Sequence, residues 1–148
     1  MSYIKIYVHA VWSTKDRVPL LADKVIRQAM WDHIRENAVQ KGIFIDTING
    51  YVDHCHCLIS LGGDQSIRKI VQLIKGESSN WINQSGRLSG RFSWQKEFFA
   101  SSVSVSRLPV VRKYLYDQEV HHQRISFQDE YREFIREAGF QVPGMMHE

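Results

Sequence analysis

The sequence lacks the features that mark membrane and secreted proteins. No apolar run approaches the ~18 residues of a membrane span, and residues 1–5 do not form the start of a secretory signal. Only two cysteines occur, Cys55 and Cys57, and two cysteines so close together are not a disulfide framework. We therefore expect a cytoplasmic protein with reduced thiols and no membrane partner.

Internal repeats and low-complexity linkers are also absent, and the 148 residues correspond to one ordinary domain. Hydrophobic residues make up 43% and charged residues 24% of the chain, as in an average globular protein. This composition excludes a disordered tail, a collagen and a coiled coil.

The formal net charge of +3 is small, but it is unevenly distributed. Residues 66–113 carry nine Lys or Arg against two Asp or Glu, whereas residues 114–148 carry three against seven. Aromatic residues such as Trp81 and Trp94 lie among the positive charges. Two interpretations remain open: a surface for a polyanion with exposed bases, or a solvated face with core aromatics between its charges.

Periodicity predicts an α+β fold. The expected elements are a strand over 4–12, a helix over 24–40, strands over 43–52 and 54–61, a helix from 67 to about 83, a strand over 98–105, a helix from 109 and a helix from 127 to about 139. Asp23, Ser66 and Ser126 are the expected N-caps. The first six elements have the order of the ferredoxin-like (split βαβ) fold, an antiparallel sheet with helices on one face.

The segment from His54 to Cys57 holds four potential metal ligands in a row. Because side chains alternate along a strand, both histidines face one way and both cysteines face the other, toward the core. One ion therefore cannot be bound by all four. The histidine pair alone either shares a metal or consists of ordinary hydrogen-bonded histidines.

Tyr114 and Gln118 are four residues apart on a predicted helix, about 40° apart around its axis. Tyr116 lies about 160° from Tyr114 by the same arithmetic. Tyr114 and Gln118 therefore share a face. The alternative is that Tyr114, between Val111 and Leu115, is a core aromatic.

Taken together, these segments resemble the single-tyrosine HUH transposases of minimal bacterial insertion sequences and their REP-associated relatives. The resemblance rests on four segments in order along most of the chain, at 9–17, 54–56, 94–103 and 114–131. At position 117, Asp stands where the family more often has Asn. The resemblance implies that Tyr114 is the nucleophile and that His54, His56 and Gln118 bind one divalent metal, Mg²⁺ or Mn²⁺. Imidazole ligands alone would favour zinc, nickel or copper.

The implied activity is cleavage and rejoining of single-stranded DNA at hairpin-bearing element ends through a 5′-phosphotyrosine. The resemblance also implies a homodimer in which subunits share active sites. The alternative is a non-catalytic, domesticated protein that binds single-stranded or hairpin nucleic acid. Candidate phosphate contacts, some of which we expect to be ordinary surface charges, are Lys15, Arg17, Arg68, Lys69, Lys75, Arg87 and Arg91.

We expect a HUH core over about 1–106, followed by the tyrosine helix and a C-terminal helix over about 107–140. The acidic C-terminal helix is expected to lie away from the positive block. His9 on the first strand is expected to be a hydrogen-bonded strand histidine, and the alternative is that it neighbours the metal site. For His121 and His122 two roles remain open: a proton relay or phosphate contact, or cations near a helix C-terminus.

Overall fold

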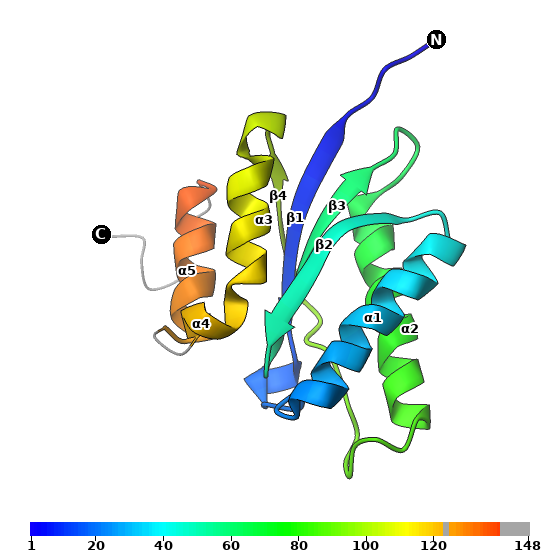
Figure 1. Cartoon of the computed structure of the whole chain (residues 1–148), viewed down its shortest axis with the longest axis vertical. Helices are drawn as coiled ribbons and strands as arrows, with labels where there is room; N and C mark the ends of the chain where they lie inside the picture. Colours follow the sequence, from blue (N-terminus) through cyan, green and yellow to red (C-terminus); the bar gives the residue numbers. More distant parts are fainter. Residues whose placement is uncertain (123–124, 140–148) are drawn as a thin grey trace.

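A four-stranded antiparallel sheet forms the centre of the protein (Figure 1). The computed structural model describes residues 1–122 and 125–139. The strands are β1 (Ile6–Ser13), β2 (Phe44–Tyr51), β3 (His54–Leu61) and β4 (Phe99–Val103), in the order β2-β3-β1-β4. This order confirms the ferredoxin-like prediction, with β1 and β3 as the central pair.

Helices α1 (Lys24–Gln40) and α2 (Ile67–Gln84) cover one face of the sheet (Figure 1). Their apolar sides pack on a core that includes Trp12, Cys55 and Cys57. The predicted N-caps are confirmed, since Asp23 accepts hydrogen bonds from two backbone amides of α1 and Ser66 accepts one from α2.

The C-terminal helices lie on the opposite face, as Figure 1 shows. They are α3 (Leu108–Tyr116), α4 (Gln118–His122) and α5 (Phe127–Glu137). Ser126 caps α5, as predicted, by accepting a hydrogen bond from Asp129 N. The chain therefore forms three layers, with the sheet between two groups of helices.

Some predicted bounds were wrong, and one predicted helix is divided in two. The first strand begins at Ile6 rather than at residue 4, and the last ends at Val103, where Val105–Arg107 form a 3-10 turn (η2). The helix expected to carry both Tyr114 and Gln118 is two helices, broken at Asp117, which has φ −91° and ψ 15°. Within the described ranges, no helix combines the length and apolar character needed to cross a membrane.

Candidate active site

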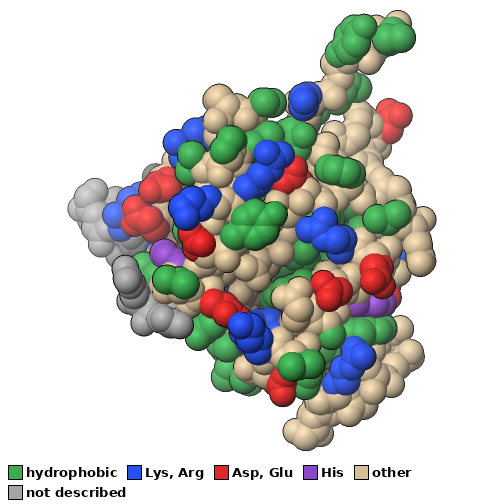
Figure 2. Space-filling model, viewed as in Figure 1, with side chains coloured by type: hydrophobic (Ala, Val, Ile, Leu, Met, Phe, Trp, Pro, Cys, Tyr) green, Lys and Arg blue, Asp and Glu red, His purple; other side chains and the backbone are tan. Residues whose placement is uncertain are grey.

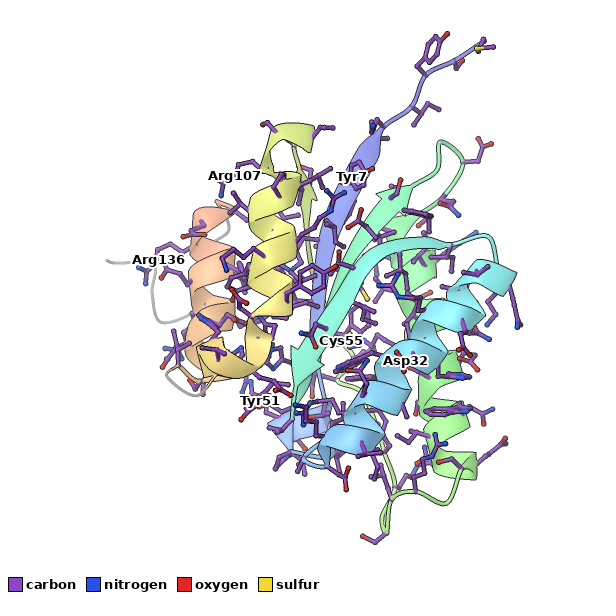
Figure 3. All side chains as sticks on the ribbon, in the orientation of Figure 1. Tyr7, Asp32, Tyr51, Cys55, Arg107 and Arg136 are labelled. Atoms are coloured by element: carbon purple, nitrogen blue, oxygen red, sulfur yellow. The ribbon has the colours of Figure 1, made fainter. Side chains whose placement is uncertain are left out.

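The alternation of β3 determines which side chains enter the site. Residues 54–57 are all buried, with Cys55 and Cys57 in the core beneath α1 and α2. In Figure 3, Cys55 lies between the strands and α1. The two free thiols are 4.0 Å apart, and burial raises the pKa of Cys55 above its ordinary value. His54 and His56 face the other way, toward α3, α4 and α5, as the sequence predicts.

The close approach of β2 to β3 fixes the position of His54. A Cβ on Gly50 would lie 2.1 Å from the backbone oxygen of His54, so no larger residue fits without displacing that strand. The His54 side chain is held in turn by Asp53, whose carboxylate accepts a hydrogen bond from Nδ1 at 2.9 Å. When the ring is neutral and donates from Nδ1 in this way, its free electron pair is on Nε2.

Gln118 reaches this electron pair from α4. Its Oε1 lies 3.0 Å from Nε2 of His54, while its Nε2 donates to the backbone oxygen of Tyr114 at 3.3 Å. Nε2 of His54 and Oε1 of Gln118 are thus hydrogen-bond partners in a fully buried place, and each is an atom that can bind a metal. A cation between them would satisfy both, so the donor set fits the divalent metal that the resemblance implies.

His56 is held from β1. The Nε2 atom of His9 lies 2.8 Å from Nδ1 of His56, so His9 is a hydrogen-bonded strand histidine, as expected, and also a neighbour of a candidate metal ligand. Burial, with the nearby His56, lowers the pKa of His9 to about 3. Burial likewise lowers the pKa of His56 to about 4, although Glu130 opposes the shift. Both rings are therefore neutral at neutral pH, and a neutral imidazole is the form that binds metals.

Tyr114 lies beside the histidines of its own chain. Its ring centroid is 5.7 Å from that of His56, and its hydroxyl donates a hydrogen bond to the Glu130 carboxylate. The Nε2 atom of His121 lies 3.3 Å from the same hydroxyl. Burial and the negative charge of Glu130 raise the pKa of Tyr114, so the phenol is protonated at neutral pH.

Glu130 is the residue that the sequence analysis missed. Its side chain is only 3% exposed and lies 2.9 Å from Nε2 of His56, 2.9 Å from Nε2 of His121 and 3.0 Å from Nε2 of His122. Burial alone would raise the pKa of Glu130, but hydrogen bonds from His122 and His56 outweigh it and hold that pKa below its ordinary value. Glu130 is therefore a carboxylate.

Helix α5 packs on the histidine face of the sheet, so the expectation that it lies away from the positive block holds for α2, on the opposite face, but not for β4, where α5 contacts Phe99. Phe127 stacks on His54 at 4.2 Å, and Phe134 meets His9, His56 and Tyr114 edge-on. Arg17 and Tyr131 line one cavity of about 280 Å³. The sequence did contain a signal for Glu130 as a buried residue. It lies on the apolar side of an amphipathic helix, at helical spacing from Phe127, Tyr131 and Phe134.

The predicted phosphate contacts divide between two places. Lys15 and Arg17 lie on the exposed turn after β1, near α5. The other five are on α2 or the following loop, and α2 covers the face opposite the histidines. Arg87 is stacked on Trp81 at 4.9 Å, and Lys75 donates to the backbone oxygen of Lys96 at 2.9 Å. Figure 2 shows Lys and Arg mixed with Asp and Glu on the viewed face, rather than one positive patch.

His121 and His122 both face Glu130 from the last turn of α4. The His122 ring also stacks on the ring of Tyr51, with 5.7 Å between the ring centroids. Tyr51, labelled in Figure 3, is the last residue of β2. Within the described chain, one group of His, Cys, Asp or Glu side chains is arranged to hold an ion. It consists of His54, His56, His122 and Glu130, whose ligand atoms all lie within 4.8 Å of one another.

Comparison with known proteins assigns the class. Residues 2–118 match the family described as "Transposase IS200 like", so the chain belongs to this family of DNA transposases. It is 27% identical over 115 residues to the ISDra2 transposase TnpA of Deinococcus radiodurans, a match that covers 74% of this chain and 81% of that protein.

Two solved structures share the fold. A crystal structure of a transposase from Deinococcus radiodurans R1 has a TM-score of 0.62 and 23% identity, covering 79% of this chain and 93% of that one. A REP-associated tyrosine transposase bound to a REP hairpin also has a TM-score of 0.62, with 19% identity, covering 84% of this chain and 73% of that one. Helix α5 lies beyond the residues that match the family.

Proposed function

We propose that this protein cleaves and rejoins single-stranded DNA at the ends of an insertion element, through a 5′-phosphotyrosine on Tyr114. In this proposal His54, His56 and Gln118 bind one divalent metal, Mg²⁺ or Mn²⁺. The observation that carries it is the meeting of a half-buried tyrosine hydroxyl with two buried imidazoles and a buried amide oxygen in one site of one chain.

The chemistry follows from these residues. The Tyr114 oxygen attacks phosphorus, the bond to the 3′ oxygen breaks, and the 3′ oxygen takes up a proton as the phenol loses one. Because the phosphotyrosine retains the energy of the phosphodiester, a second 3′ hydroxyl can reseal the strand without ATP. A bound divalent metal would polarise the scissile phosphate and neutralise charge that develops on the leaving oxygen. Gln118 and the two histidines would keep that metal beside the nucleophile.

Access for a DNA backbone is available on the side of Tyr114. An open groove of about 530 Å³ lies over α3 and α4, and is lined by Val110, Lys113, Tyr114, Asp117, Val120 and His121. Lys113 and His121 are suited to contact a phosphate there. We further propose that the substrate carries a hairpin, since the REP-associated relative with the same fold is bound to one.

The test is covalent capture of DNA. The protein is incubated with a labelled single-stranded element end, with and without Mn²⁺, and analysed on a denaturing gel. We expect a metal-dependent adduct that Tyr114→Phe abolishes while DNA binding is kept. An adduct formed by Tyr114→Phe would show that the nucleophile is a different residue. Salt-sensitive binding without any adduct would instead support the non-catalytic binding protein.

The homodimer with shared sites and the cytoplasmic location stay predictions. So does the division into a HUH core over about 1–106 and a C-terminal part over about 107–140, of which residues 123–124 and 140 lie outside the described ranges. The arrangement in this chain brings Tyr114 to the histidines of the same chain. Sharing between subunits is therefore not required to complete the proposed site.

A further inference from the structure

The carboxylate of Glu130 lies between the two histidines proposed to bind the metal. We propose that Glu130 is itself a ligand of that metal, alongside His54, His56 and Gln118. The inference rests on the metal site of the proposed function and adds one ligand to it. That ligand comes from α5, outside the residues 2–118 that match the family.

The spacing of the donor atoms supports this assignment. Oε1 of Glu130 lies 2.9 Å from Nε2 of His56 and 3.6 Å from Nε2 of His54. Nε2 of His54 is in turn 3.0 Å from Oε1 of Gln118. Ligands about 2.1 Å from an octahedral ion lie about 3 Å from their nearest neighbours. Two of these three separations therefore match adjacent ligands around one ion, and the separation of Glu130 from His54 is somewhat longer.

Charge and ligand type support it as well. His54, His56 and Gln118 are all neutral as ligands, so they leave the full charge of a buried cation uncompensated. Glu130 adds one negative charge and a hard oxygen, which produces a two-histidine, one-carboxylate set. A set of this kind suits Mn²⁺ better than imidazoles alone. Glu130 is only 3% exposed, and its ion-pair partners in the described parts of the chain are all histidines, with no Lys or Arg among them.

The second carboxylate oxygen of Glu130 would position Tyr114. Oε2 accepts the hydrogen bond from Tyr114 and lies 2.9 Å and 3.0 Å from His121 and His122. One side chain thus contacts the proposed metal ligands through Oε1 and the proposed nucleophile through Oε2. Glu130 would thereby hold the Tyr114 hydroxyl next to the ion.

Mn²⁺ affinity of the full-length protein tests the inference without DNA. Metal-free wild type, Glu130→Gln, Glu133→Gln and His54→Ala are titrated with Mn²⁺ by calorimetry. Glu133 is the matched control, because it is an exposed glutamate of the same helix. We expect Glu130→Gln to bind Mn²⁺ at least about 10-fold more weakly, and Glu133→Gln to stay within about twofold of wild type.

His54→Ala distinguishes a failure of this inference from a failure of the proposed metal site. If His54→Ala weakens binding while Glu130→Gln does not, the metal site stands and Glu130 is not a ligand. If neither variant changes the affinity, the metal site of the proposed function is also wrong.

A second measurement uses only the wild type, in case Glu130→Gln does not fold. Metal ligation by Glu130 would tie α5 to the sheet. Mn²⁺ should therefore slow amide hydrogen exchange across residues 127–137 at least about 10-fold. Unchanged or faster exchange in α5 at saturating Mn²⁺ would overturn the inference.

Discussion

Gly50 offers a sharp test of how the backbone positions His54. In the structure a Cβ at residue 50 would lie 2.1 Å from the His54 backbone oxygen and 2.9 Å from the Trp31 ring. Real Cβ atoms come no closer than about 3.0 Å to such an oxygen. The backbones of β2 and β3 must therefore move apart by close to 1 Å at His54. Overpacking of this size typically costs about 1–3 kcal/mol. We therefore expect Gly50→Ala to lower the free energy of unfolding by about that amount.

Gly76 is the matched control for this substitution. It lies inside α2, is exposed, and has nothing within 4 Å of the position that a Cβ would take. Alanine in a helix interior is more stable than glycine by about 0.5–1 kcal/mol. The same change of residue is therefore expected to stabilise the protein at position 76 and to destabilise it at position 50.

Urea unfolding followed by far-UV circular dichroism measures both variants. If Gly50→Ala proves as stable as wild type, the tight contact between β2 and β3 is not as described, and the reasoning about His54 fails.

Three further predictions concern the helices around the site. Arg112 donates two hydrogen bonds to Asp46 and lowers the pKa of this carboxyl, so the pair stabilises the fold above about pH 4 and this stability is lost as the pH falls further. Asp46→Asn should therefore reduce the acid sensitivity of Tm below about pH 4. Tyr114 lies beside His56 of the same chain, so mixing His56→Ala with Tyr114→Phe should restore no adduct, whereas a restored adduct would support the sites shared between subunits that the resemblance implies. Phe134→Ala, which removes ring contacts with three site residues, should cost about 1–3 kcal/mol and expose α5 to proteolysis, and an unchanged digestion pattern would contradict this.

The sequence predicted the features that depend on local physics. Alternation along β3 separates His54 and His56 from the two cysteines, and that separation is the basis of the site. Asp23, Ser66 and Ser126 cap their helices because a short polar side chain satisfies free amides at a helix start. Tyr114 and Gln118 remain neighbours despite the break at Asp117, because Gln118 still donates to the backbone oxygen of Tyr114.

The docking of α5 could not be predicted in the same way. Amphipathicity shows that one side of a helix is buried, but not which face of the sheet buries it. The answer depends on long-range contacts, such as Phe127 on His54 and Phe134 on His9. Net acidity did not identify Glu130 as a site residue, because the exposed glutamates and Glu130 count equally in a charge sum. Arg136, on the outer side of α5 in Figure 3, belongs to the solvated side of the same helix.

The two roles of α5 have a thermodynamic consequence. The helix is held by aromatic contacts with the site and, in our proposal, by a metal ligand at its centre. Any ligand that binds only the docked state stabilises that state by mass action. Metal affinity and the docking equilibrium of α5 must then change together, so a packing defect at Phe134 should weaken Mn²⁺ binding although this side chain offers no ligand atom. The reverse effect follows from the same linkage: Mn²⁺ should protect α5 in wild type and lose that effect in Glu130→Gln.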